Sequence, residues 1–280
     1  MSNPEFPSRS GRIAFIGGGN MARSLIGALV GAGAGAGSIV VAEPDETLRA
    51  ALASDFGVTT HADNAAAVAS ADTIVIAVKP QVLRDVCLAL GPAIGEAKPL
   101  VVSIAAGIRI DQIETWLGRK LPVVRAMPNT PALVGAGATG LIANPRVDAS
   151  ARARADAILG AAGRTAWIDD EALMDTVTAL SGSGPAYFFL LVEALEDAAV
   201  AQGLPRETAR LLASQTCLGA GRMLVESGEA PARLRERVTS PNGTTAAALA
   251  TFDAGGFRQL VADAVDSATQ RGRELSAHGA

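Results

Sequence analysis

A short apolar run that leads into a glycine-rich turn constrains the fold of this chain more than any other feature. Residues 13–16 (IAFI) precede residues 17–22 (GGGNMA), a G-x-G-x-x-A turn at the start of a helical pattern. Gly17 permits the tight turn, Gly19 lets the backbone approach a pyrophosphate, and Ala22 allows the helix to pack closely on the strand. The helix N-terminus adds unpaired N–H groups and a partial positive charge. The turn therefore favours dinucleotide binding over a purely structural glycine-rich connection.

An acidic residue stands where a dinucleotide-binding fold needs one. Glu43 directly follows the second apolar run, residues 39–42, and the fingerprint expects an acid about 20 residues beyond the glycine turn. A carboxylate at this place accepts hydrogen bonds from the ribose hydroxyls of NAD and repels the 2′-phosphate of NADP. The next basic residue along the chain is Arg49. We therefore expect NADH to be preferred, with a Glu43 that only points into solvent as the alternative.

Apolar runs alternate with alanine-rich segments in the first half of the chain. This alternation is typical of a doubly wound α/β domain, in which helices cover both faces of a parallel sheet. Helices are predicted to begin at Asn20, Pro44, Pro80 and Ile110, and His61 is placed in a polar loop. Strong strands are predicted at residues 13–16, 39–42, 73–78, 100–104 and 123–127, and weaker ones at 140–143 and 165–168.

Strand-like runs disappear after residue 170, and the second half reads as helices. Residues 256–275 carry one apolar stripe at helical spacing, and a bundle of such helices often buries its surplus stripe against a second copy of itself. We therefore expect an obligate dimer. The predicted organisation is a disordered leader over 1–11, a Rossmann-type dinucleotide-binding domain over 12–168 and an all-α dimerisation and substrate domain over 169–280. Helices are predicted at residues 172–180, 185–201, 205–226, 231–238, 244–252 and 256–275.

Composition excludes several classes of protein. A net charge of −4 and 4% aromatic residues give no support to a nucleic-acid-binding surface. The longest uncharged stretches are interrupted by glycines, so no membrane span is predicted. Residues 1–11 lack the apolar segment of a secretory signal, and a cytoplasmic product is expected. Cys87 and Cys217 are too few and too far apart for a metal knuckle, and no metal site is predicted.

Small residues and prolines follow three further strand ends, at residues 79–80, 103–107 and 127–131. These ends meet at the carboxyl edge of an open α/β sheet, where ligands bind, and small residues there suit a flat nicotinamide ring. Lys79 is equally suited to a phosphate or substrate carboxylate and to capping a neighbouring helix.

Two hydroxyl-rich loops precede helices in the second half, at residues 181–187 (SGSGPAY) and 239–245 (TSPNGTT). Their N–H and hydroxyl donors suit an anion such as a carboxylate, and two well-capped helices are the alternative. Neither His61 nor His278 lies where a catalytic acid or base is expected, and the sequence shows no Ser-His-Asp order or paired-carboxylate motif. A nicotinamide enzyme of this kind suits a substrate that arrives already activated, such as a protonated imine.

Five sequence blocks together resemble the Δ1-pyrroline-5-carboxylate reductase family, which catalyses the last step of proline synthesis. The blocks occur in the family's order at residues 75–80 (VIAVKP), 103–107 (SIAAG), 125–131 (RAMPNTP), 180–187 (LSGSGPAY) and 240–245 (SPNGTT). The resemblance implies a Rossmann domain followed by a helical dimerisation domain, with dimers that often assemble into decamers. It also implies reduction of (S)-1-pyrroline-5-carboxylate, a cyclic imine, to L-proline by NADPH or NADH.

The resemblance also implies roles for individual residues. The substrate carboxylate is bound by Thr244 and Thr245 in a loop that faces the partner subunit's cofactor, and Thr245, the catalytic candidate, forms a hydrogen bond to the ring nitrogen. The other substrate-binding residues are Ser240, Asn242 and Gly243. The cofactor residues are Ile16, Gly17, Gly18, Gly19, Asn20, Met21 and Ala22 at the pyrophosphate, Glu43 and Asn64 on the adenosine side, Ala77, Val78, Lys79, Pro80, Ala105, Ala106 and Gly107 at the nicotinamide, and Asn129.

Two positions depart from the family pattern. Glu43 stands where the family often has a small polar residue, so the family's use of NADPH stays open beside the expected NADH. Asn242 replaces a glycine of the substrate loop. Among residues other than glycine, asparagine best tolerates a positive φ, so the loop is expected to keep its shape. Two other functions remain as alternatives: a relative acting on a hydroxyacid or another cyclic imine, and a dinucleotide-binding scaffold without turnover. The hydroxyacid enzymes need a lysine on their helical domain, and this chain has no lysine after Lys120.

Overall fold

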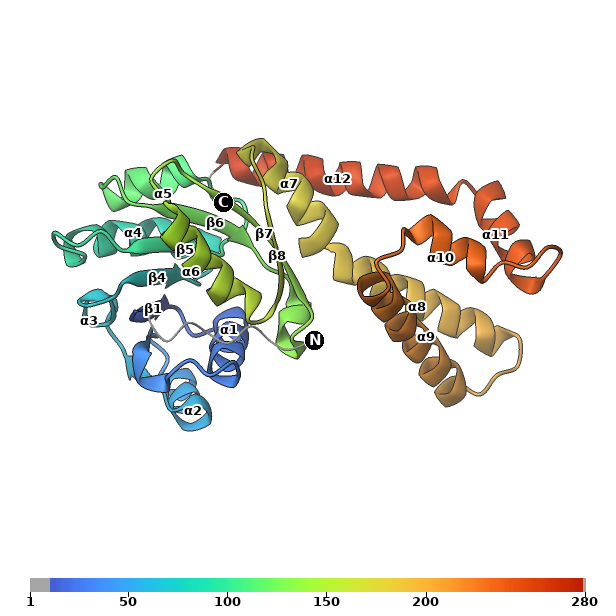
Figure 1. Cartoon of the computed structure of the whole chain (residues 1–280), viewed down its shortest axis with the longest axis horizontal. Helices are drawn as coiled ribbons and strands as arrows, with labels where there is room; N and C mark the ends of the chain where they lie inside the picture. The colour runs from blue at the N-terminus through green and yellow to red at the C-terminus, as the bar shows by residue number, and fades with distance from the viewer. Residues whose placement is uncertain (1–10, 279–280) are drawn as a thin grey trace. The chain divides into compact units, whose positions relative to one another are not determined.

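A computed structural model describes residues 11–278 of the chain, so the predicted leader lies outside the described residues except for Gly11. Within this range the strands form an eight-stranded sheet in the order β3-β2-β1-β4-β5-β6-β7-β8 (Figure 1). The order reverses between β1 and β4, which is the switch point of a doubly wound fold. The strands are β1 (Ile13–Ile16), β2 (Ile39–Ala42), β3 (Thr59–His61), β4 (Thr73–Ile76), β5 (Leu100–Ser103), β6 (Val123–Met127), β7 (Gly137–Ala143) and β8 (Gly163–Trp167).

The sheet is parallel from β3 to β6, and β7 then pairs with β6 in the antiparallel direction. No direction was predicted for the strand at 140–143, and its antiparallel pairing departs from the pattern of the strands before it. The link from β6 to β7 contains only a short 3-10 turn (Thr130–Val134), and a parallel pairing needs a longer crossover. His61 lies in β3 and not in the loop predicted for it. The sequence did not predict this strand because its three residues have no strong apolar pattern.

Two hydrophobic cores cover the two faces of the sheet, and Phe15 and Ile16 of β1 show the alternation. Phe15 packs in one core with α1 (Asn20–Gly31) and α6 (Ala149–Gly160), whereas Ile16 packs in the other with α4 (Pro80–Ala93) and α5 (Ile110–Leu117). The two remaining helices of this part are α2 (Glu46–Phe56) and α3 (Asn64–Val68). The predicted doubly wound arrangement is confirmed by helices on both faces (Figure 1).

The helix predicted to begin at Pro44 begins two residues later. Asp45 is the N-cap of α2, and its carboxylate accepts a hydrogen bond from the Leu48 N–H at 3.0 Å. A side-chain acceptor satisfies an N–H group that the first turn leaves unpaired, and proline supplies none. Asn20, Pro80 and Ile110 are the first residues of α1, α4 and α5, as predicted.

The chain divides into two compact units. Of the described residues, one unit contains 11–182 and 268–278, and the other is Ser183–Ser267. This division differs from the predicted boundary at 168/169, since the segment before Ser183 and the end of the last helix belong with the sheet. The later elements are a 3-10 turn (Glu171–Leu173), α7 (Met174–Val177), a π-helical turn (Thr178–Gly182), α8 (Gly184–Ala201), α9 (Arg206–Glu226), α10 (Pro231–Arg237), α11 (Thr244–Ala254) and α12 (Phe257–His278).

Unit Ser183–Ser267 leaves large apolar side chains uncovered in the single chain. Phe189 of α8 and Leu260 of α12 are 68% and 66% exposed. Contiguous exposed apolar side chains on a helical unit indicate a protein interface. Among the helices of residues 11–278, none combines the length and apolarity that crossing a membrane requires.

Candidate cofactor and substrate site

The glycine turn after β1 has the geometry that its sequence predicts. Gly17 has a φ of +96°, and a Cβ built on it would lie 2.8 Å from the Ala77 carbonyl oxygen. A Cβ built on Gly19 would meet nothing within 4 Å, so this side of the turn is open. Gly19 is the N-cap of α1, and the first turn of that helix contains no acidic residue. Open space beside unneutralised N–H groups fits a pyrophosphate.

Glu43 lies against the glycine turn. Its Oε2 accepts a hydrogen bond from the Gly18 N–H at 2.7 Å, and its Oε1 accepts one from the Asp45 N–H at 3.0 Å. Glu43 directly follows β2 and is half-buried. The alternative of a side chain that only points into solvent is therefore excluded. The carboxylate is held at the place where a dinucleotide fold binds the adenosine ribose.

Arg49 of α2 supports this strand end, a role that the sequence did not predict. Its Nη1 donates to the carbonyl oxygens of Glu43 and Pro44, at 2.7 Å each. The sequence signal for such a contact is a basic residue six positions after the acid at the strand end. The guanidinium therefore fixes the backbone that carries the Glu43 carboxylate.

The other predicted cofactor residues of the first unit lie at the carboxyl ends of the parallel strands. Ala77 donates its N–H to the Ile16 carbonyl at 2.8 Å, and the N–H of Ile104 bonds to the Ile76 carbonyl at 3.1 Å. The turns after β1, β4 and β5 are therefore connected along one rim. Within residues 11–278, no carboxylate lies within ion-pair distance of the exposed Lys79. At this rim also lie Val78 and Pro80 after β4, Ala105, Ala106 and Gly107 after β5, Asn64 at the start of α3, and Asn20, Met21 and Ala22 in the first turn of α1.

Asn129 has protein partners for both ends of its buried side-chain amide. The Oδ1 accepts from the Ala138 N–H, and the Nδ2 donates to the Ser181 carbonyl, both at 2.9 Å. Ser181 lies in the π-helical turn, an irregularity that is frequent at functional sites. The Asn129 side chain therefore joins the end of β6 to the segment that leads into α8.

The predicted substrate turn, residues 240–245, lies in the second unit, whereas the predicted cofactor residues lie in the first. Asn242 has a φ of +60°, as its tolerance for this region predicts, and the Gly243 N–H bonds to the Ser240 carbonyl at 3.1 Å. Thr244 begins α11, whose first turn contains no acidic residue, and Thr245 is half-buried. The turn presents hydroxyls beside a helix N-terminus, which suits a carboxylate.

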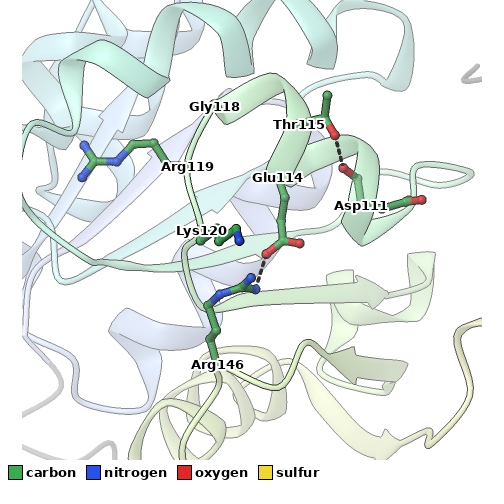
Figure 2. A pocket seen from close by; sticks show the side chains of 7 residues that line it. All are labelled: Asp111, Glu114, Thr115, Gly118, Arg119, Lys120 and Arg146. Carbon is green, nitrogen blue, oxygen red and sulfur yellow. Dashed lines mark hydrogen bonds and ion pairs between the residues drawn. The ribbon is translucent and has the colours of Figure 1, made fainter.

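An open pocket of about 440 Å³ lies where α5 ends and β6 begins (Figure 2). It is therefore at the amino end of β6, whereas the glycine turn follows the carboxyl end of β1. Glu114 projects into it and pairs with Arg146 at 2.5 Å, and Asn144 donates to the same carboxylate at 2.9 Å. None of the predicted site residues lines this pocket. Between Gly11 and His278, no cluster of three histidine, cysteine, aspartate or glutamate side chains has the geometry to hold a metal ion.

The fold and the rim define a class of protein: an oxidoreductase with a Rossmann-type dinucleotide-binding domain and a separate helical unit. Residues 171–275 match the family described as pyrroline-5-carboxylate reductase dimerisation, and residues 12–107 match one described as NADP oxidoreductase, coenzyme F420-dependent. The dimerisation match indicates self-association.

Two bacterial proteins resemble the chain over nearly its whole length. Pyrroline-5-carboxylate reductase of Pseudomonas aeruginosa is 53% identical over 265 residues, which cover 95% of this chain and 97% of that protein. The solved structure of a pyrroline-5-carboxylate reductase from Coxiella burnetii aligns with a TM-score of 0.93 at 43% identity, covering 96% of this chain and 99% of the other. The chain belongs to the pyrroline-5-carboxylate reductase family.

A more distant relative carries a cofactor. The structure of pyrroline carboxylate reductase from Plasmodium falciparum, determined with NADP bound, aligns with a TM-score of 0.82 at 29% identity over 95% of this chain and 98% of that one. The resemblance inferred from the five sequence blocks and the predicted fold class are both confirmed by these comparisons.

Proposed function

We propose that this protein reduces (S)-1-pyrroline-5-carboxylate to L-proline at the expense of a reduced nicotinamide dinucleotide. The observation that carries the proposal is the 53% identity to a pyrroline-5-carboxylate reductase over 95% of the chain. The open glycine turn and the rim of small residues support it independently, because they fit a dinucleotide and a flat ring.

The proposed cofactor is NADH. The Glu43 carboxylate, held by the Gly18 N–H, is an acceptor for ribose hydroxyls and repels a 2′-phosphate. Arg49 does not offset this repulsion through its Nη1, since that group donates to two backbone carbonyls. NADPH stays the second candidate, because the Plasmodium falciparum relative was determined with NADP bound.

The proposed substrate site is the turn over residues 240–245, facing the cofactor of the partner subunit. Thr244 and Thr245 bind the carboxylate through their N–H and hydroxyl groups, with Ser240, Asn242 and Gly243 shaping the turn. Thr245 also forms a hydrogen bond at the ring nitrogen and favours the protonated imine. When bound, a reduced nicotinamide supplies the hydride that this imine carbon accepts, so the residues of the chain contribute positioning and electrostatic stabilisation.

The proposed assembly is a homodimer, formed through the exposed apolar side chains of the helical unit, with a decamer as the proposed higher state. The cytoplasm stays the compartment that the sequence predicts.

Steady-state kinetics with NADH and NADPH in parallel tests the function. We expect pyrroline-5-carboxylate to oxidise the cofactor with L-proline as the product, a higher kcat/KM for NADH, and no turnover of hydroxyacids. Turnover of a hydroxyacid in place of the cyclic imine would assign the chain to another substrate. Cofactor binding without turnover of either substrate would indicate a scaffold.

A further inference from the structure

Arg125 is an arginine buried within the sheet. It lies in β6 with 3% of its surface exposed, and its Nη1 lies 3.1 Å from the Glu171 carboxylate. Its Nη2 lies 3.8 Å from Asp175 Oδ1. Burying a charge is costly unless it is paired, and an apolar residue would fill the same place at no electrostatic cost. The two carboxylates belong to segments outside the sheet, so the arginine connects separate parts of the unit.

The first carboxylate connects Arg125 to the start of α5. The same Glu171 oxygen that pairs with the guanidinium accepts a hydrogen bond from the Ile110 N–H at 2.9 Å. Ile110 is the first residue of α5, so its N–H has no partner within the helix. Gly107 stands three residues earlier and ends the turn after β5. Glu171 therefore holds the end of that turn against the sheet.

The second carboxylate connects Arg125 to the last turns of α12. The Ser276 hydroxyl donates to Asp175 Oδ1 at 2.9 Å, and both residues are buried. A Cβ built on Gly272 would lie 3.2 Å from the Asp175 Cβ, so the helix approaches closely there. Leu275, between these two positions, lies 3.7 Å from where a Gly107 Cβ would stand. The end of α12 therefore packs on the same turn after β5.

We propose that Arg125 is a positioning residue for the nicotinamide, acting through the turn formed by Ala105, Ala106 and Gly107. Glu171 binds the N–H of Ile110, three residues beyond the turn, and Asp175 binds Ser276, whose neighbour Leu275 packs on Gly107. The inference rests on the proposed function, which assigns this turn to the nicotinamide ring. Small displacements of a reacting ring matter, since a shift of about 1 Å can cost about a hundredfold in rate.

Arg125→Lys and Ser276→Ala test the proposal in the full-length protein. Calorimetric titration compares NADH with ADP-ribose, which has the adenosine and pyrophosphate but no nicotinamide. For Arg125→Lys we expect ADP-ribose affinity within about twofold of wild type, NADH affinity at least fivefold weaker and kcat at least tenfold lower. The isotope effect with NADH deuterated at C4 should increase, because hydride transfer becomes rate-limiting. Ser276→Ala, which removes one hydrogen bond, should move each value in the same direction by a smaller factor.

Arg273→Met removes an exposed arginine from the same end of α12 and serves as the matched control, with no change expected. A variant that melts earlier but keeps wild-type NADH affinity, kcat and isotope effect would make Arg125 purely structural and overturn the proposal. Equal losses of NADH and ADP-ribose affinity would overturn it as well. If the wild-type protein failed to reduce the cyclic imine, the proposed function would fail, while the two titrations would still report on the positioning.

Discussion

The Glu43 carboxylate and the Gly18 N–H are joined by a 2.7 Å hydrogen bond that links the tip of β2 to the glycine turn after β1. This bond connects the acid proposed to bind the ribose with the turn proposed to hold the pyrophosphate. A Cβ built on Gly18 would lie 3.2 Å from the Glu43 Cβ, so the two segments are also in close contact. We therefore expect cofactor choice and phosphate binding to be coupled at this corner of the sheet.

Glu43→Ser is expected to change the choice of cofactor. The substitution removes a hydrogen-bond acceptor for the ribose hydroxyls and the charge that repels a 2′-phosphate. A hydrogen bond to a charged group contributes about 1.5–3 kcal/mol, so kcat/KM for NADH should fall by about tenfold or more. The value for NADPH should hold or rise. Glu46→Ser, at an exposed acid in the first turn of α2, should leave the ratio of the two values unchanged. An unchanged ratio in Glu43→Ser would remove the acid from cofactor recognition.

Gly19→Ala separates cofactor binding from folding. The added methyl group meets no protein atom within 4 Å, so the melting temperature should stay within a degree or two of wild type. Because the methyl group occupies the place proposed for the pyrophosphate, affinity for both NADH and ADP-ribose should fall at least tenfold. Gly17→Ala should instead destabilise the protein itself, since it combines a φ of +96° with a 2.8 Å contact to the Ala77 carbonyl oxygen. Full NADH affinity in Gly19→Ala would place the pyrophosphate elsewhere.

Thr245→Ala tests the proposed substrate turn. Thr245→Ala removes the hydroxyl that is proposed to accept a hydrogen bond from the protonated ring nitrogen, so kcat should fall, and loss of one such catalytic hydrogen bond costs on the order of a hundredfold. The dissociation constant of NADH, measured without substrate, should stay nearly constant. Thr251→Ala, an exposed threonine on the same helix, provides the control. If NADH binding collapsed while turnover per bound cofactor stayed normal, Thr245 would belong to the cofactor site instead.

The sequence correctly predicted features that short motifs determine, namely the bounds of three strands, the position of Glu43 and the conformation of Asn242. The strands β1, β2 and β6 have the predicted bounds because each is a short, fully or largely buried run of mostly apolar residues. Residue spacing placed Glu43 beside the glycine turn, and the tolerance of asparagine for positive φ predicted the conformation of Asn242. In these cases the deciding interactions lie within the motif itself.

The features that the sequence did not predict depend on contacts between residues far apart in the chain or on the length of a connection. Arg125 reads as one more strand residue, because its partners Glu171 and Asp175 lie more than 40 positions away and carry no shared motif. The strand β3 was missed since its three residues, Thr59–His61, are exposed or half-buried and pair only through the sheet edge. The direction of β7 followed from the short link at Thr130–Val134 rather than from the composition of the strand.

Glu196→Gln should change how stability depends on pH. Glu196 on α8 accepts hydrogen bonds from Arg210 and Arg206 of α9, and these bonds hold the pKa of its carboxyl below the ordinary value of 4.5. A lowered pKa contributes stability that is present above 4.5 and is lost as the pH falls through the lower folded-state value. Wild type should therefore have a higher melting temperature than Glu196→Gln at pH 7, and the difference should shrink as the pH falls below 4.5. Glu193→Gln, an exposed glutamate on the same helix, should melt like wild type throughout. A constant difference from pH 7 to pH 3 would contradict the charge-based explanation.

Leu260→Asp should weaken self-association. Leu260 is 66% exposed in the single chain and belongs to the apolar stripe at the start of α12, and a symmetric dimer contains each interface residue twice. Burying one leucine contributes about 1.5–3 kcal/mol, so losing two should weaken the dimer by at least about a hundredfold. Sedimentation velocity over a dilution series measures the change. Leu88→Asp alters an equally large leucine that is 50% exposed on α4 of the sheet-containing unit, and it should leave the assembly intact. Because the substrate turn is proposed to face the partner's cofactor, Leu260→Asp should lose turnover on dilution in parallel with the dimer. Full activity of its monomer would instead place the substrate and cofactor sites within one chain.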